Sequence, residues 1–187
     1  MEASPGREAS WNSKPWRVAA WSAAAGLMLL PMAVQLTYGH FGWSFFDFVG
    51  IGMILLSGCT IFDLIARRAP NFAYLAGAGA ALAAGFGLVV VNGAVGLVGS
   101  EDEAHNVYFY AAPLFAILGS IFAGGQPMPM AKAMLAAAGV QMAVSIALLI
   151  DANGVSDGNP QVEVIGLSIF ALLWLGSAWL FRVSSKP

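Results

Sequence analysis

Six long apolar stretches, separated by short polar connections, constrain this chain more than any other feature of its sequence. A helix needs about 20 apolar residues to cross a bilayer, because each residue advances it by about 1.5 Å. Only 10% of the 187 residues are charged and 59% are hydrophobic. A soluble domain carries roughly 25% charged residues. Too few charges remain to cover a water-facing surface, so lipid must solvate much of the chain.

The sequence therefore predicts an all-α fold, a polytopic membrane helix bundle with six transmembrane helices. The predicted spans cover residues 16–38, 45–66, 72–93, 101–123, 131–150 and 160–181. They form a single six-helix transmembrane domain over 16–183, between a cytoplasmic N-terminal segment at 1–15 and a cytoplasmic tail at 184–187. The short connections favour antiparallel neighbours.

Basic residues all fall on one side of this predicted topology. The Lys and Arg residues are Arg7, Lys14, Arg17, Arg67, Arg68, Lys132, Arg182 and Lys186. The other side holds both histidines and most of the acids, from His40 to Glu163. The positive-inside rule then places both termini in the cytoplasm. Removing one span would scatter the cations over both sides, so their segregation also supports the count of six.

Several functional classes are excluded or disfavoured by the same composition. The net charge is −2 and no basic patch is present, so nucleic acid is not an expected partner. The single cysteine, Cys59, can form no internal disulfide and belongs to no Cys/His metal motif. Nothing resembles a nucleophile elbow, a P-loop, a HExxH helix or a dinucleotide fingerprint. No catalytic residue and no cofactor are predicted, and the chain is not expected to be an enzyme.

Small and polar residues inside the spans predict close helix packing. Gly77, Ala81 and Gly85 recur every four residues, a row that lets helices approach closely. Gln141 and Ser145 share one face and could hydrogen-bond a neighbouring helix. Such faces could also support a homo-oligomer, but six spans already offer many internal interfaces.

Two acids at the ends of the second span have structural interpretations. Ser44 and Asp47 have the spacing of a capping box, in which each side chain satisfies the backbone of the other residue. Asp63 lies one turn before Arg67 and is expected to form an ion pair with it.

The polar stretch from Asn92 to Asn106 reads NGAVGLVGSEDEAHN and contains an acidic cluster and a histidine. Ser100 and Glu103 predict a capping box for the fourth span, with three acids in its first turn. Residues 93–99 are predicted to be either an extension of the third span or a re-entrant segment.

A metal site on the outer face is the competing interpretation of this acidic cluster. Its candidate ligands are His40, Asp47, Glu101, Asp102 and His105. Histidine and carboxylate ligands suit Zn²⁺ and other divalent metals, but their spacing matches no established ligand motif. The sequence therefore predicts no metal site.

Three short segments resemble a family of small, uncharacterised bacterial multi-spanning inner-membrane proteins. They are NGAVGLVGSED at 92–102 with Asn106 and Tyr108 after it, Trp43 with Asp47 and Phe48, and AWLFR at 178–182. The resemblance implies a multi-pass location in the bacterial cytoplasmic (inner) membrane. It implies no activity, cofactor or catalytic residue.

Three functional hypotheses remain open at this point. The first is a non-enzymatic accessory or structural subunit of a membrane complex, whose partners are the lipid bilayer and other membrane subunits. The second is a transporter or channel for a small neutral solute, with Gln35, Asn92 and Gln141 as polar lining. The third is an outer-face metal-binding membrane protein.

Overall fold

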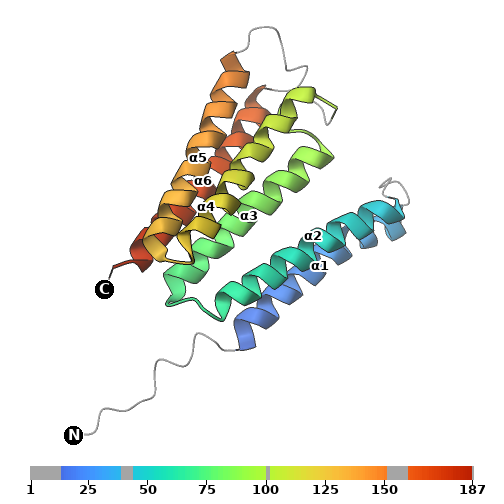
Figure 1. The fold of residues 1–187 in the computed structure, drawn as a ribbon. Helices are drawn as coiled ribbons and strands as arrows, with labels where there is room; N and C mark the ends of the chain where they lie inside the picture. Colours follow the sequence, from blue (N-terminus) through green and yellow to red (C-terminus); the bar gives the residue numbers. More distant parts are fainter. Residues whose placement is uncertain (1–13, 39–43, 100–101, 151–159, 187) are drawn as a thin grey trace, which may run out of the picture. The chain divides into compact units, whose positions relative to one another are not determined.

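The computed structural model describes residues 14–38, 44–99, 102–150 and 160–186. Within these ranges the chain is almost entirely helical, and it divides into two compact units. Unit 1 is residues 1–69 and unit 2 is residues 70–187. Figure 1 shows the helices of each unit.

Unit 1 is a hairpin of two helices, α1 (Lys14–Tyr38) and α2 (Phe45–Ala66). Pro31 lies inside α1, and the helix continues through it. The predicted capping box at the start of α2 is confirmed. The Asp47 backbone N–H donates to Ser44 Oγ at 3.3 Å, and the Ser44 backbone N–H donates to Asp47 Oδ2 at 2.7 Å.

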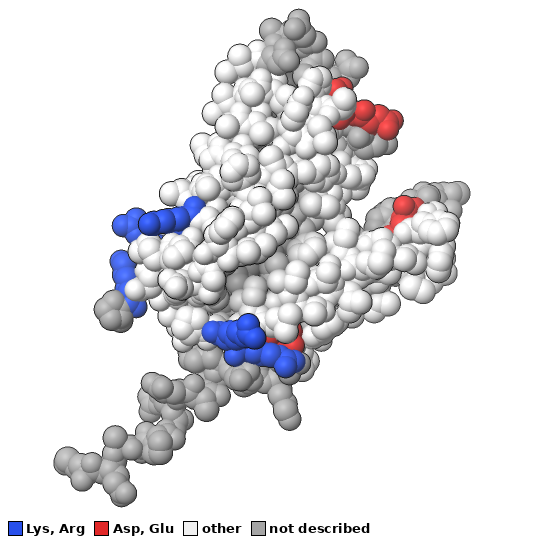
Figure 2. All heavy atoms as spheres, in the orientation of Figure 1, with Lys and Arg blue, Asp and Glu red and all other residues white. Residues whose placement is uncertain are grey.

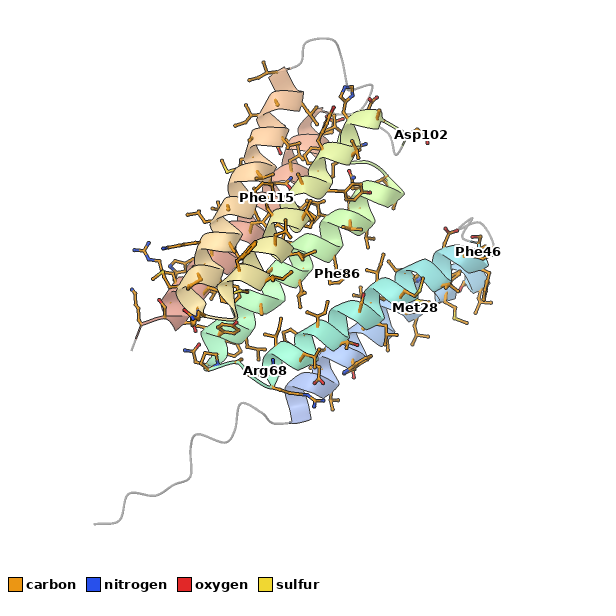
Figure 3. The ribbon with its side chains drawn as sticks, in the orientation of Figure 1. Met28, Phe46, Arg68, Phe86, Asp102 and Phe115 are labelled. Carbon is orange, nitrogen blue, oxygen red and sulfur yellow. The ribbon has the colours of Figure 1, made fainter. Side chains whose placement is uncertain are left out.

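The other end of α2 carries the predicted ion pair. Arg67 donates from Nη2 to Asp63 Oδ2 at 2.8 Å, and from Nε to the same oxygen at 3.2 Å. The two interactions confirm the prediction made from the spacing of four residues. Figure 3 labels Phe46, in the first turn of α2, and Arg68, just beyond the end of the helix.

The two helices of unit 1 make few close contacts with each other. No residue of α2 is buried. The helices touch where Cys59 Sγ lies 3.7 Å from the Ala20 carbonyl oxygen. They also approach at Gly52, where an added Cβ would lie 3.6 Å from Met28 Cε. Unit 1 is thus a helical pair without a core of its own.

Unit 2 is a bundle of antiparallel helices that has such a core. Its elements are α3 (Phe72–Ala94), a 3₁₀ helix η1 (Ala104–Tyr110), α4 (Ala111–Ala123), α5 (Pro127–Ile150) and α6 (Pro160–Ser184). Helix α6 packs between α3 and α5, and α4 packs on the other flank of α5. Figure 1 shows this arrangement.

Small residues bring α3 and α6 together, as the glycine row predicts. A Cβ added to Gly77 would lie 3.3 Å from Leu180 Cβ, and one added to Gly85 would lie 3.5 Å from Trp174 Cη2. Ser177 Oγ also donates to the Gly77 carbonyl oxygen at 2.7 Å. Close approach therefore allows a hydrogen bond between the two helices, which the hydrophobic effect cannot hold together in lipid.

Helices α4 and α5 approach even more closely. A Cβ added to Gly119 would lie 2.6 Å from Ala133 Cβ, a separation that real side chains do not adopt. Glycine is therefore required at this position unless the two helices separate.

Five helical segments of the described chain are long and apolar enough to cross a membrane, which marks the chain as an integral membrane protein. They are Phe45–Ala66, Phe72–Ala94, Ala104–Ala123, Pro127–Leu148 and Val162–Ser184. In α1 the apolar segment is shorter, Val18–Val34. The prediction of a helical bundle is thus confirmed, while the sixth crossing stays a prediction.

The predicted helix boundaries lie within two residues of the observed ones except at three ends. Helix α6 continues to Ser184 rather than ending at 181. Helix α5 begins at Pro127 rather than 131, because proline is well tolerated in the first turn of a helix. The fourth span begins at Ala104 rather than 101, and its first seven residues are a 3₁₀ helix. The reason for the late start of the fourth span lies in the loop that precedes it.

Candidate functional site

The loop between α3 and η1 folds back into the bundle. Helix α3 ends at Ala94, and Leu97 and Val98 are buried in the core of unit 2, beside Leu148 of α5 and Leu167 of α6. Of the two alternatives predicted for residues 93–99, the helical extension is therefore excluded beyond Ala94. The loop instead covers the end of the bundle.

Glycines allow this change of direction. Gly96 has φ 75° and Gly99 has φ 70°. Residues with a Cβ rarely adopt this left-handed conformation. The two glycines flank Leu97 and Val98, which lets the chain turn before and after the two buried side chains.

Asn106 holds the loop in place. Its Oδ1 accepts from the backbone N–H groups of Leu97 and Val98, both at 3.1 Å. Its Nδ2 donates to the Val98 carbonyl oxygen at 3.0 Å. Asn92 Nδ2 in turn donates to the Asn106 carbonyl oxygen at 2.9 Å. We call the hydrogen bonds among Asn92, Leu97, Val98 and Asn106 the asparagine clasp.

The clasp answers a strict physical requirement. Asn106 is 4% exposed, and the backbone groups of Leu97 and Val98 are buried outside any helix. An unpaired backbone group in such a place costs roughly 1–3 kcal/mol. One asparagine side chain supplies both the acceptor and the donor that the loop needs.

A buried carboxylate ties α6 to the same loop. Glu163 lies in the first turn of α6 and is only 9% exposed. Its Oε1 accepts from the Gly99 backbone N–H at 3.0 Å. A carboxylate is also favoured beside the positive end of a helix dipole. Glu163 therefore joins two segments that lie 64 residues apart in the sequence.

The predicted capping box before the fourth span is wrong. Glu103 is the residue that precedes η1 instead of the third residue inside a helix, and it makes no side-chain capping bond. No acid lies in the first turn of η1. Ser100 and Glu101 are outside the described residues. The tertiary bonds of the clasp position this segment, and they outweigh the local capping preference.

His105 pairs with an acid, but the described part of the chain contains no cluster of metal ligands around it. His105 Nδ1 lies 2.6 Å from Glu103 Oε1. Among the described residues no group of three His, Cys, Asp or Glu side chains could hold a metal ion. His40 and Glu101 lie outside the described residues. Asp47 is in unit 1, and Asp102 is an exposed residue of unit 2.

Of the three residues predicted as polar lining, Asn92 and Gln141 have described side chains. The side chain of Gln35 is outside the described part of the structure. Asn92 is buried and belongs to the clasp, although its Oδ1 has no hydrogen-bond partner there. Gln141 is fully buried in α5, on a helix that does not pack on α3. Among the described residues no hydrogen bond joins Asn92 to Gln141.

Gln141 is the most unusual polar group of unit 2. Neither its Oε1 nor its Nε2 hydrogen-bonds any described group. Ser145 does not bond a neighbouring helix as predicted, because its Oγ donates at 2.8 Å to the Gln141 backbone carbonyl one turn earlier. Trp174 Nε1 is buried and without a partner too.

Sequence reasoning missed the role of Asn106 and of Glu163. Asn106 gave one signal, a polar residue close after a glycine-rich apolar run. Glu163 gave a weak one, an acid in the first turn of a predicted span. Their partners lie eight or more residues away, so spacing alone could not identify them.

No protein-family model, no curated protein and no solved structure matches this chain. The resemblance of segment 92–102 to bacterial inner-membrane proteins stays a prediction.

Proposed function

We propose that this chain is a non-catalytic accessory subunit of a complex in the bacterial cytoplasmic membrane. Unit 2 is the part that folds around its own core, and unit 1 is the part that another subunit completes. The observation that carries the proposal is the absence of any buried residue in α2. A transmembrane helix pair with so little internal packing gains its stability from lipid or from a neighbouring protein.

Small residues in unit 1 offer a place for such a neighbour. A Cβ added to Gly26 of α1 or to Gly50 of α2 would meet no heavy atom of the described chain within 4 Å. Helix association in lipid depends on small residues that allow backbones to approach. Open glycines on both helices therefore suit the approach of another helix.

The polar groups of the described chain support a structural role. Asp47 caps α2, Asp63 pairs with Arg67, and Asn106 and Glu163 hold the loop of unit 2. Each of these groups bonds a backbone group or a charge of the fold. Catalytic acids and bases, in contrast, need a side chain that can reach a substrate.

The charges support an orientation with both termini in the cytoplasm. Within unit 2 the described Lys and Arg residues lie at one end and the Asp and Glu residues at the other, which Figure 2 shows in blue and red. We call these the basic end and the acidic end. The positive-inside rule assigns the basic end to the cytoplasm. A sixth crossing by Val18–Val34 of α1, within the range of about 17–25 residues that can span a bilayer, completes this topology.

Native mass spectrometry of the tagged full chain, extracted from its own membrane in mild detergent, tests the subunit role. We expect a heteromeric complex of fixed stoichiometry. Gly50→Trp should dissociate it, because the indole fills the open space beside α2. Gly176→Trp is the matched control, since a Cβ there also meets no described atom within 4 Å but lies in unit 2.

Three outcomes would contradict the subunit role. The wild-type chain could emerge only as a monomer, or only as a homo-oligomer. The two tryptophan variants could also lose the partner equally, which would mean that unit 1 is not the contact surface.

A second function, passage of a small neutral solute, is favoured by one observation. Both amide atoms of Gln141 lie buried in unit 2 without a hydrogen-bond partner among the described residues. Buried polar groups are normally paired, so an unpaired amide suits a water or solute that it can bond. Liposome swelling with glycerol and urea tests this function. Equal rates for wild type and Gln141→Leu would eliminate it.

A further inference from the structure

A groove runs between α5 and α6 at the basic end of unit 2. Its volume is about 410 Å³, within the range of roughly 300–1,000 Å³ that small-molecule sites occupy. Its lining residues are Met128, Ala131, Lys132, Leu135, Leu175, Ala178, Trp179 and Arg182. All of them belong to α5 or α6, so one unit forms the whole groove.

Small apolar side chains lie deep in the groove, and larger apolar side chains lie along its edges. Ala131 and Ala178 are buried, at 7% and 8% exposure, and their methyl groups leave depth between the helices. Leu135, Leu175 and Trp179 are exposed beside them. A groove of this form suits an extended hydrocarbon chain that lies along the two helices.

Two cations complete the lining. Lys132 is in the second turn of α5 and Arg182 is in the last turn of α6. Both are exposed, and neither forms an ion pair in the part of the chain that the structure describes. The described acids of unit 2, Asp102, Glu103 and Glu163, lie at the opposite end.

Trp179 adds a further feature of membrane contact. Its side chain is 64% exposed, one turn before Arg182. Tryptophan is enriched at membrane interfaces, where its ring lies among the lipid headgroups. The groove therefore combines an interfacial indole, two exposed cations and an apolar channel.

We propose that this groove binds one anionic phospholipid. The lipid phosphate lies between Lys132 and Arg182, and an acyl chain follows the groove past Leu135 and Leu175. Basic pockets between transmembrane helices on the cytoplasmic side are suited to anionic headgroups. Arginine contributes paired N–H donors to phosphate oxygens, while lysine contributes a flexible point charge.

The apolar part of the lining favours a lipid over a soluble phosphate as the ligand of this groove. Every lining residue except the two cations is apolar. A free phosphate would use only the cations and leave the rest of the groove to water, which is unfavourable for apolar surface. A lipid satisfies both parts of the site. The inference is independent of the accessory-subunit role.

Thermal unfolding of the detergent-purified full chain, with added short-chain phosphatidylglycerol, tests the proposal. We expect a concentration-dependent rise in Tm that phosphatidylcholine and inorganic phosphate do not produce. Each cation is worth about 1 kcal/mol near an anionic lipid, or about fivefold in affinity. The double variant Lys132→Gln/Arg182→Gln should therefore bind phosphatidylglycerol about 25-fold more weakly.

Lys186→Gln is the matched control, because Lys186 is exposed at the same end but does not line the groove. It should bind phosphatidylglycerol within about twofold of wild type. Leu175→Trp fills the groove without changing any charge, and it should weaken binding if the acyl chain lies there. It also keeps the proposal testable if the double variant fails to fold.

Several results would overturn the proposal. An equal shift with phosphatidylcholine would show that the headgroup charge is not recognised. An equal loss in Lys186→Gln would show general attraction to a basic surface. A shift with inorganic phosphate alone, unaffected by Leu175→Trp, would assign the cations to a soluble anion.

Discussion

The acidic and basic ends of unit 2 satisfy their polar groups in different ways. At the acidic end, the asparagine clasp and Glu163 bond the backbone of the loop at 95–99. At the basic end, Lys132 and Arg182 lie beside an open groove without an ion-pair partner among the described residues. Figure 3 labels Asp102 at the acidic end, next to the start of η1.

The difference shows which end of unit 2 is held by internal hydrogen bonds and which end leaves its charged side chains exposed. Apolar contact gives transmembrane helices little preference for each other over lipid, so hydrogen bonds and close backbone approach determine their positions. The acidic end carries a network whose partners are internal. The basic end carries exposed cations that form no ion pair with any described residue.

The largest expected effect comes from breaking the clasp. Asn106→Leu removes the acceptor of the Leu97 and Val98 N–H groups and the donor to the Val98 carbonyl. At roughly 1–3 kcal/mol for each buried unpaired group, we expect a loss of about 3 kcal/mol or more. Denaturant unfolding in detergent measures it.

Tyr108→Leu is the control for this variant, because Tyr108 lies on the same 3₁₀ helix but is exposed. It should change the free energy of unfolding by less than about 0.5 kcal/mol. Equal effects of the two variants would mean that the clasp contributes nothing.

The next effect concerns the close contact of α4 and α5. Gly119→Ala forces a Cβ to within 2.6 Å of Ala133 Cβ, so we expect a loss of about 1–3 kcal/mol. Adding Ala133→Gly should restore part of it, because the second change removes the clashing atom. Gly139→Ala, where a Cβ meets no described atom within 4 Å, is the control. Failure of Ala133→Gly to rescue would contradict the contact.

Local sequence spacing was sufficient to predict much of the fold. Ser44 and Asp47 predicted their capping box, Asp63 predicted its pair with Arg67, and the small residues from Gly77 predicted a packed face. Each prediction depends on residues three or four positions apart, or on a repeat of that spacing. Helix geometry alone brings such residues together.

Features that depend on tertiary contact were beyond the sequence. Glu163 meets Gly99 only after α6 has packed beside α3. Ser100 and Glu103 had the spacing of a cap, but buried bonds from Asn106 fixed the segment differently. The groove likewise required α5 and α6 to lie side by side before Lys132 could meet Arg182 in one lining.

A smaller effect is expected where Glu163 joins the acidic end to α6. Glu163→Gln keeps an oxygen that can accept from Gly99 but removes the charge that strengthens the bond. We expect a loss of about 1 kcal/mol in the free energy of unfolding. Asp102→Asn, at an exposed acid of the same end, should have almost no effect. Equal changes in both variants would point to net charge rather than to this hydrogen bond.

The smallest effect, and one of opposite sign, is expected at Gln141. Gln141→Leu removes an amide that has no described partner, so stability should be unchanged or should rise by up to about 1 kcal/mol. Thermal unfolding of Gln141→Leu and of Asn106→Leu, measured together, compares the loss of an amide that has no described partner with the loss of a hydrogen-bonded amide. A loss as large as that of Asn106→Leu would show that Gln141 has a partner in the membrane.

Amide hydrogen exchange of the full chain in lipid nanodiscs tests most directly whether side-chain hydrogen bonds hold the loop at 95–99 closed over the acidic end. The peptide covering residues 95–99 lies outside any helix, yet its Leu97, Val98 and Gly99 N–H groups are bonded to side chains. Opening the clasp costs about 3 kcal/mol, so these amides should exchange at least about a hundredfold more slowly than in an unfolded chain. Exchange at the rate of an unfolded chain would contradict the account, because it would mean that these bonds do not hold the loop closed.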